Sequence, residues 1–545
     1  MKFPSFPVLA LSLAPFLALA PGAFAAGHAD HVVVIVWDGL RPDLVTETST
    51  PVLFQLMRSG VFFSRHHPVY PSSTEVNGTA LATGDYPFHS GILGNRVYRP
   101  DLDPLTLTAT ENPDAIRKGD QISGGKYLAV PTLEERLQAL GFPTLVAGTK
   151  EVALLHDRGD KGPGASEAAR HSVVLYQGMA APASALDPLV AAQGAFPPKV
   201  TYPNLMQDAW TTQAVVGTFW KEALPKFTLL WLSDPDFTQH ESFPGADPSL
   251  QALRGSDHNL SKILDALDQH GLRAQTDVIV VSDHGFSTVS QVVDVAAVLQ
   301  QNGFKAGRRY LPGTTPQPGD IVVAGNSGTV FFYVIGRDPA VTAKLVAFLQ
   351  QSDFAGVVMS RDPLPGTFPL SLLNLDAPGA PDVAVAMRWT NELNHAGVPG
   401  MIVSDLGRAP GQGNHTSLSR FDMHNTLIAA GPDFRKAWTD PVPSGNTDIA
   451  PTVAAILGVP TDDPPMDGRV LTEALRDGPE DKDGPVLPKV DQQRLTATAP
   501  AGGAFWNQYL LVETVNGTVY FDEGNGGQGP APIPAPAPAS TPPNP

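Results

Sequence analysis

Acidic and imidazole side chains follow three short apolar runs of this chain. Each run has the composition of a strand that is buried in a parallel sheet. The loops after such strands line one crevice, so these side chains can meet although they are far apart in the sequence. Oxygen and nitrogen ligands without sulfur suit zinc, with manganese or iron as alternatives. The runs and the residues after them are 32–37 with Asp38, 228–232 with Asp236 and His240, and 278–282 with Asp283 and His284.

Each of these residues also has an ordinary structural explanation when taken singly. Asp38 could cap a following helix, and Asp283 with His284 could form a turn. Asp236 and His240 share a face only if their segment is helical. Carboxylates at three strand ends, two of them with an imidazole, are nevertheless an unusual coincidence. The combination therefore favours a metal site.

Residues 70–84, Tyr-Pro-Ser-Ser-Thr-Glu-Val-Asn-Gly-Thr-Ala-Leu-Ala-Thr-Gly, are consistent with two interpretations. In the first, Ser72 and Glu75 form a capping box at a helix start. In the second, the free backbone N–H groups of that helix start hold an anion such as phosphate. A hydroxyl beside a metal could then act as a nucleophile. Composition and spacing leave both interpretations open.

The elements that must position these residues alternate between strands and helices. A fourth apolar run covers residues 142–147, and residues 253–267 have apolar positions at helical spacing. This alternation predicts an α/β fold with a mostly parallel central sheet and helices on both faces. Of the 545 residues, 42% are apolar, which is enough for a sizeable core.

Charge and cysteine content exclude several function classes. Lys and Arg number 36 against 54 Asp and Glu, so the formal net charge is 36 − 54 = −18. This balance argues against binding duplex nucleic acid, because phosphate-backbone contacts need clustered cations. The absence of cysteine excludes disulfides, thiolate zinc sites and cysteine nucleophiles.

Both ends of the chain differ in composition from the rest. Residues 1–25 combine Lys2, an apolar stretch and a small-residue cleavage pattern, which predicts a signal peptide cleaved near Ala25. The predicted catalytic domain covers residues 28–490 and includes a loop-rich insertion or cap at 300–412. A small β-hairpin at 500–523 turns at Asn516 and Gly517. Residues 524–545 are rich in Pro and Ala and predict a disordered tail.

In combination, these motifs resemble the alkaline phosphatase superfamily, and within it the type I phosphodiesterase/nucleotide pyrophosphatase branch. The resemblance covers about residues 31–459, and its specificity lies in the order of five motifs. They are Asp38 after its strand; the hydroxyl-bearing helix ending in Ala-Thr-Gly with Tyr-Pro-x-His-x-Gly-Ile (to Ile92); Asp-Pro-Asp-x-x-x-His (234–240); Ser-Asp-His-Gly (282–285); and Gly-Asn-His-Thr (413–416), followed by Asp-Met-His-Asn-Thr (422–426).

The resemblance implies two zinc ions and a two-step phosphoryl transfer. It makes Thr74 the nucleophile, which also binds a metal, and gives Asn77 the role of binding a non-bridging phosphate oxygen. His424 is a lesser candidate, and His66, His67, His89 and His258 match no ligand position. The implied ligand sets are Asp236, His240 and His415 for one zinc, and Asp38, Asp283, His284 and Thr74 for the other.

The sequence departs from the family pattern at two places. Thr416 stands where the family commonly has glycine, so the turn after His415 is open to difference. Lys150 matches the first cation of the Lys-x-Arg or Lys-x-Lys element with which monoesterases of the superfamily hold a doubly charged phosphate, but Val152 replaces the second. A single cation suits a singly charged diester or a less firmly held monoester. Lys150 is therefore a substrate-binding candidate, with a solvent-facing lysine as the alternative.

These observations predict an exported hydrolase of small phosphoric esters or nucleotides, secreted or periplasmic and without a transmembrane segment. A phosphodiesterase or nucleotide pyrophosphatase is the first hypothesis. An alkaline phosphomonoesterase is the second, favoured if Lys150 points into the site. The Cys/Ser-x-Pro-x-Arg element of sulfatases is absent around Thr74. A third hypothesis is a catalytically silent exported protein that binds metal. Leaving group, oligomeric state and the role of the insertion are not predicted.

Overall fold

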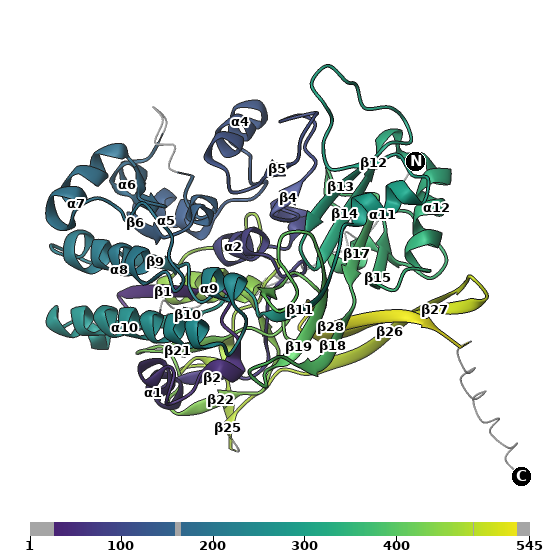
Figure 1. Ribbon diagram of the computed structural model, residues 1–545. Helices are drawn as coiled ribbons and strands as arrows, with labels where there is room; N and C mark the ends of the chain where they lie inside the picture. Colours follow the sequence, from purple (N-terminus) through teal and green to yellow (C-terminus); the bar gives the residue numbers. More distant parts are fainter. Residues whose placement is uncertain (1–26, 159–164, 483, 531–545) are drawn as a thin grey trace, which may run out of the picture.

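The apolar runs of the sequence form a nine-stranded sheet at the centre of the molecule (Figure 1). The computed structural model describes residues 27–158, 165–482 and 484–530. The five central strands β10, β1, β9, β6 and β7 are parallel, whereas β21 and β8 pair antiparallel with their neighbours. The predicted mostly parallel sheet is thus confirmed. In spatial order the strands are β22 (Trp438–Asp440), β2 (Val61–Phe63), β21 (Leu427–Ala430), β10 (Thr276–Val281), β1 (His31–Trp37), β9 (Phe227–Leu232), β6 (Thr144–Gly148), β7 (Val173–Tyr176) and β8 (Met179–Ala181).

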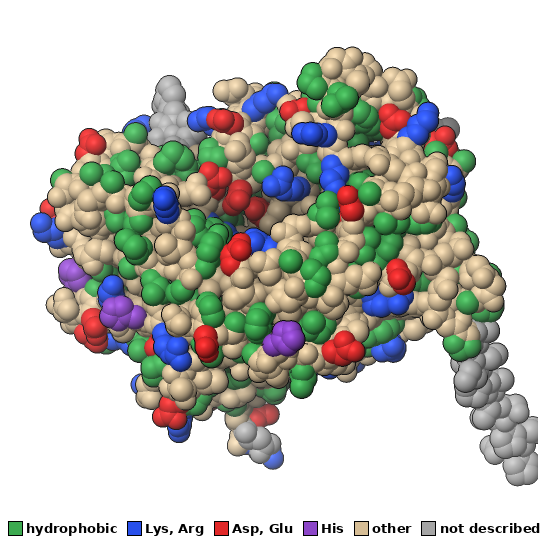
Figure 2. Space-filling view, in the orientation of Figure 1, with side chains coloured by type: hydrophobic (Ala, Val, Ile, Leu, Met, Phe, Trp, Pro, Cys, Tyr) green, Lys and Arg blue, Asp and Glu red, His purple; other side chains and the backbone are tan. Residues whose placement is uncertain are grey.

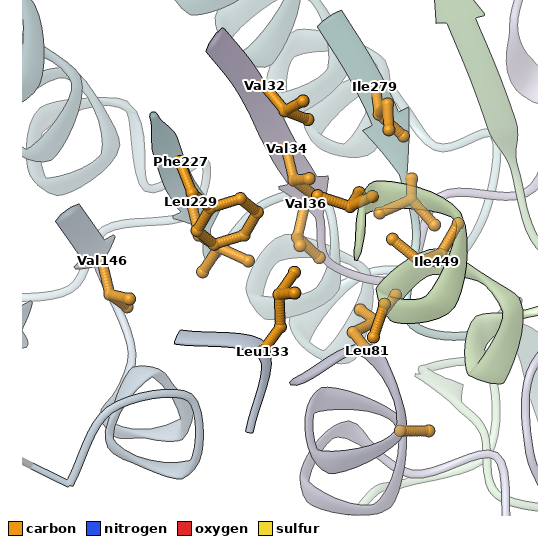
Figure 3. Close-up of a cluster of buried hydrophobic side chains, with 14 of the residues drawn as sticks. Val32, Val34, Val36, Leu81, Leu133, Val146, Phe227, Leu229, Ile279 and Ile449 are labelled. Carbon is orange, nitrogen blue, oxygen red and sulfur yellow. The ribbon is translucent and has the colours of Figure 1, made fainter. Parts of the chain in front are cut away.

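Helices cover both faces of this sheet because successive side chains of each strand point to opposite faces. On one face Val32, Val34 and Val36 of β1 pack with Leu81 and Ile449, as Figure 3 shows. The alternate residues of β1 belong to a second core on the other face. The helices of the first core are α2 (Thr74–Thr83), α5 (Leu133–Ala139) and α13 (Ile449–Leu457); those of the second are α1 (Pro51–Ser59), α8 (Leu205–Ala214) and α10 (Asp247–Gln269), which contains the predicted helix.

The predicted insertion at 300–412 contains a second sheet with six strands (Figure 1, upper right), and this sheet packs in a hydrophobic core to which residues before and after the insertion also contribute. Its longest helix is α12 (Pro339–Leu349), which packs on this core. A hydrogen bond ties this sheet to the segment around His415. The Thr329 hydroxyl donates to the carbonyl oxygen of Thr416. The strands of the sheet are β12 (Ala306–Gly307), β13 (Ile321–Asn326), β14 (Thr329–Val334), β17 (Val383–Met387), β15 (Ala355–Ser360) and β16 (Phe368–Pro369).

The C-terminal part of the described chain forms an antiparallel sheet of β26 (Val490–Ala501), β27 (Ala504–Val515) and β28 (Thr518–Gly529). Asn516 and Gly517 have φ values of 52° and 95°, as a tight two-residue turn between strands requires, so the predicted hairpin is present. Its third strand was not predicted.

The last strand continues past the predicted start of the C-terminal tail. The sequence places the start of a disordered tail at Gly524, but β28 continues to Gly529, because the backbone of β27 pairs with it over this length. Residues 531–545 of that tail and the predicted signal peptide at 1–25 lie outside the described residues. Among the helices within the described ranges, none is long and apolar enough to cross a bilayer.

The buried carboxyl of Asp277 on β10 makes the stability of the sheet depend on pH. Burial, and then the neighbouring Asp433, raise the pKa of Asp277 to about 8. The folded protein therefore binds a proton that the unfolded chain releases near pH 4, so this residue makes stability fall as the pH rises from about 4 to about 8. We expect Asp277→Asn to raise the free energy of unfolding by roughly 1–4 kcal/mol above pH 8 and to have little effect below pH 4.

Urea unfolding of both proteins at pH 4, 7 and 9 measures this difference. Asp265→Asn is the control, because it makes the same substitution at an exposed position on α10, outside the sheet. A constant difference between parent and Asp277→Asn at all three pH values would contradict the assignment.

Candidate active site

Two groups of three ligand-type side chains lie at the carboxyl edge of the central sheet. Within each group the nitrogen and oxygen atoms that could bind a metal lie within 4.8 Å of one another. The carboxylate of Asp236 joins the groups, because its Oδ1 lies 3.2 Å from His240 Nε2 and 4.0 Å from His284 Nε2. The groups are Asp236, His240 and His415, and Asp38, Asp283 and His284.

Local structure explains how these residues are positioned. Asp38 directly follows β1, and Asp283 follows β10 after Ser282. Asp236 and His240 lie one turn apart on α9 (Asp236–Glu241), so the segment that could have been a loop is helical. His415 follows β20 (Gly413–Asn414), which pairs with β11 (Ser287–Val293).

Backbone carbonyl groups orient all three histidines of these groups. The Nδ1 atoms of His240, His284 and His415 lie 3.1, 2.9 and 2.8 Å from the carbonyl oxygens of Gly413, Gly285 and Ser72. A carbonyl only accepts, so each Nδ1 carries the proton and each Nε2 presents a lone pair to the site. Metal-binding histidines are usually held in this way.

The carboxylates of the site include oxygens without a hydrogen-bond partner. Asp38 Oδ1, Asp236 Oδ1 and Asp283 Oδ2 are buried and bonded to no group within the described part of the chain. An unpaired buried acceptor is unfavourable unless a cation or donor meets it. Together with the three Nε2 lone pairs, these oxygens form a donor set that fits divalent cations of the zinc type.

Lys150 is the basic side chain that partly neutralises this cluster. Its Nζ lies 2.8 Å from Asp38 Oδ2 and 3.1 Å from Asp236 Oδ2, and 5.0 Å from the centre of the Phe237 ring. Lys150 therefore points into the site and does not face solvent. Val152 packs instead in the core, where its side chain faces Gly78 of α2. The position of the family's second cation is thus part of the packing between α2 and the segment after β6.

Burial and mutual repulsion shift the ionisation of these groups. Burial, and then Asp283, raise the pKa of Asp38 well above its ordinary value, and burial raises that of Asp283 to about 7. Burial also opposes ionisation of Asp236, but Lys150 and His240 outweigh it and hold its pKa well below the usual range. Burial lowers the pKa of His284, which keeps the imidazole neutral and able to bind a metal.

The Thr74 hydroxyl lies at the first residue of α2, beside the second group. Its Oγ1 is 3.3 Å from His284 Nε2. The helix starts after Ser73, and neither Ser73 nor Ser72 caps it with a side-chain hydrogen bond, since the Ser72 hydroxyl bonds to the carbonyl oxygen of Ser417. Glu75 Oε2 is likewise unbonded within the described chain. The capping-box interpretation is therefore wrong, and the helix start is free to meet an anion.

The prediction for Asn77 is corrected by the structure. The Asn77 amide is fully buried, and it donates to backbone carbonyl oxygens, including those of Val69 and Ser73. Its Oδ1 accepts from Val69 N and from Asn446 Nδ2. Asn77 therefore fixes the turn before α2 and has no donor left for a phosphate oxygen. The spacing of the motif does not show that this side chain points into the protein.

Asn95 and Glu111 belong to the site but were not predicted. Asn95 Oδ1 accepts from the Glu75 N–H at 3.4 Å, so its partly exposed amide lies at the start of α2. Asn95 lies three residues after the Tyr-Pro-x-His-x-Gly-Ile motif, and this closeness was the only indication in the sequence of a contribution to the site. Burial raises the pKa of Glu111, and burial with Glu111 raises that of Glu75, while the nearby charge of Lys150 opposes both shifts.

This edge of the sheet is open to solvent. Figure 2 shows a hollow with acidic and basic side chains at its rim, in the region where Figure 1 places α2 and α9. The start of α2 therefore lies near an opening in the molecular surface.

Comparison with known proteins agrees with this geometry. Residues 32–390 match the family described as type I phosphodiesterase/nucleotide pyrophosphatase. The chain belongs to this family. Its member from Macrovipera lebetinus, a venom phosphodiesterase, is 24% identical over 284 residues, which are 51% of this chain and 26% of that protein. Human ectonucleotide pyrophosphatase/phosphodiesterase family member 7 is 23% identical over 292 residues, 52% of this chain and 55% of that protein.

Solved structures of the family share the fold. Murine ectonucleotide pyrophosphatase/phosphodiesterase 5 aligns with a TM-score of 0.55 at 17% identity, covering 79% of this chain and 95% of that chain. That structure is of an inactive threonine-to-alanine variant in complex with AMP. This phosphodiesterase-family chain thus spans only about a quarter to a half of the curated relatives described above.

Thr416, which replaces the common glycine of the family, adopts the left-handed backbone conformation that favours glycine. Its φ is 77°, and its hydroxyl donates to the carbonyl oxygen of Asn326. The turn after His415 therefore keeps a glycine-like shape, and a β-branched residue is strained there.

At Thr416, glycine should stabilise the fold more than alanine does, whereas at ordinary helix positions alanine is the more stabilising residue. Thr416→Gly and Thr416→Ala both lose the hydroxyl, but only glycine relieves the backbone, so we expect the glycine variant to be more stable than the alanine variant by about 1 kcal/mol. Thermal or urea unfolding measures this. At Thr342, whose hydroxyl also bonds a backbone carbonyl but within α12, the order should reverse. The same order at both positions would contradict the strain.

Proposed function

We propose that this protein is a metal-dependent phosphoric ester hydrolase that transfers phosphoryl through Thr74. The observation that carries the proposal is the position of Thr74 Oγ1, 3.3 Å from His284 Nε2, at a helix start and beside both ligand groups. Asp236, His240 and His415 would hold one zinc, and Asp38, Asp283, His284 and Thr74 the other. Bound there, the two cations would lower the pKa of the Thr74 hydroxyl and offset the charge of the reacting phosphate.

The residues of the chain then have separate tasks. Thr74 Oγ1 attacks phosphorus, the ester oxygen leaves, and water hydrolyses the resulting phosphothreonine. The backbone N–H groups at the start of α2 and the Asn95 amide bind the remaining phosphate oxygens, because they lie together at that end of the helix. Lys150 adds a cationic donor.

The preferred substrate is a phosphodiester or nucleotide pyrophosphate. Support comes from the family, from the phosphodiesterases among the relatives, and from the murine relative, whose threonine-to-alanine variant is inactive and holds AMP. The position of Lys150 favours a second candidate, an alkaline phosphomonoesterase, because the ammonium lies in the site, where a doubly charged phosphate could meet it. A silent metal-binding protein is disfavoured, since it would not need Thr74 beside the ligands.

We further propose that the protein is exported, as the signal-peptide pattern of residues 1–25 predicts. A periplasmic or secreted location would give it access to small phosphate esters. The venom phosphodiesterases among its relatives support an extracellular place of action.

Replacement of the nucleophile tests the mechanism. We expect Thr74→Ala to lose at least about 10³-fold in kcat for every ester, because the nucleophilic route is removed, while metal content remains near that of the parent. Thr79→Ala is a matched control: Thr79 lies on the same helix, and its hydroxyl bonds only the Glu75 carbonyl oxygen. Near-normal turnover of Thr74→Ala would refute the assignment.

Replacement of the lysine separates the two substrate classes. Turnover of p-nitrophenyl phosphate, bis-p-nitrophenyl phosphate and thymidine 5′-p-nitrophenyl phosphate is measured with and without chelator for the parent, Lys150→Met and Lys344→Met. Lys344 is the control, because its ammonium also lies over a phenyl ring, that of Phe304, outside the site.

We expect the diesters to be the better substrates. Loss of Lys150 should lower kcat/KM roughly ten- to a hundredfold for the monoester and less for the diesters, because the monoester carries the extra charge. A faster parent reaction with the monoester would make the phosphomonoesterase the correct assignment. Absence of hydrolysis of all three esters would favour the silent protein.

A further inference from the structure

A third group of metal-ligand side chains lies outside the active site, where the C-terminal sheet meets the central domain. His67 belongs to β3 (His66–His67), His424 lies three residues before β21, and Asp522 belongs to β28. Their potential ligand atoms all lie within 4.8 Å of one another. None of the three has a role in the proposed reaction.

His67 is held in the same way as the three histidines of the active site. Its Nδ1 lies 3.1 Å from the carbonyl oxygen of Ser444, so Nδ1 carries the proton and Nε2 presents a lone pair. The ring is 1% exposed and stacks on Tyr520 at 5.8 Å. By contrast, both ring nitrogens of the adjacent His66 are bonded, to Ser444 Oγ and Asn446 Oδ1.

The buried Nε2 of His67 faces another acceptor. It lies 3.6 Å from Asp522 Oδ1, which is too long for a hydrogen bond, and it has no partner elsewhere in the described chain. A neutral imidazole lone pair and a carboxylate oxygen oppose each other unless a cation lies between them. Burial lowers the pKa of His67, so a proton does not readily fill this place at neutral pH.

His424 is the third member of this group. Its Nε2 forms a 2.6 Å hydrogen bond with Asp522 Oδ1, which a bound cation would replace, and its ring lies edge to face with that of His67, with centroids 4.9 Å apart. The side chains of His424 and Asp522 are 34% and 19% exposed, so solvent and ions can reach this group.

We propose that His67, His424 and Asp522 bind a zinc ion that fastens the C-terminal sheet to the central domain. Two imidazoles and a carboxylate form a typical zinc ligand set, and the Ser444 carbonyl supplies the supporting hydrogen bond. The ion would join β28 to β3, beside the contact in which the Tyr520 hydroxyl donates to Asp448. Its role is structural, because its ligands are separate from those grouped around Thr74.

Zinc stoichiometry of the full-length protein tests this site. Metal-free protein is titrated with Zn²⁺ against a chromophoric chelator, and bound zinc is also counted by plasma mass spectrometry. We expect Asp522→Asn and His424→Gln each to bind one zinc per chain fewer than the parent. Asp477→Asn is the matched control, because it removes the carboxylate of an exposed histidine–aspartate pair, His28 with Asp477.

A second measurement separates loss of zinc from loss of folding. Added Zn²⁺ should raise the midpoint of thermal unfolding of the metal-free parent by more than that of Asp522→Asn, while both proteins show the same circular dichroism. Ester hydrolysis by zinc-loaded Asp522→Asn should stay within about twofold of the parent, since no residue of the active site is changed. Equal zinc counts in parent, Asp522→Asn and His424→Gln would overturn the proposal, whether or not the protein hydrolyses esters.

Discussion

Three buried carboxylates, those of Asp38, Asp236 and Asp283, meet at one edge of the central sheet, and their charge must be balanced there. Each is removed from water, and each has an oxygen without a hydrogen-bond partner in the described chain. Lys150 supplies one positive charge, which leaves the cluster with an excess of negative charge. Burying unpaired charge is strongly unfavourable, which is why the pKa values of Asp38 and Asp283 are raised and why this arrangement favours cations. The donor atoms at this edge of the sheet therefore fit divalent cations, and Thr74 lies beside them at the start of α2.

The histidines show how a rigid backbone prepares such a centre. Gly413, Gly285 and Ser72 present carbonyl oxygens to three different rings, and each bond decides which ring nitrogen remains free. The same arrangement is found at His67, whose Nδ1 bonds to the carbonyl oxygen of Ser444. Because a backbone carbonyl cannot rotate away as a side chain can, each lone pair stays directed into its own ligand group. Ligand orientation thus depends on loops that come from different strands.

Much of the active site could be predicted because its residues directly follow apolar strands. Asp38 and Asp283 follow β1 and β10, and the position of a strand end is a strong pattern in a sequence. Asn77 was misjudged, since the same helical position can face a substrate or the protein interior, and packing against Val69 and Asn446 decided for the interior. Asn95 was missed because a lone asparagine in a loop carries no periodic signal. In the sequence, Val152 stands where related monoesterases have a second cation. In the folded chain its side chain packs beside Gly78.

The sequence by itself determined the α/β class and the types of ligand side chain, and the order of its motifs, through the family resemblance, singled out Thr74 as the predicted nucleophile. Only the tertiary structure decided that Lys150 points into the site and that Thr416 adopts a glycine-like turn. It also decided that the segment at 300–412 forms a sheet, and that Asp522 meets His67. These features depend on contacts between residues that are distant in the chain. Such contacts are set by the packing of whole elements, and no local pattern encodes them.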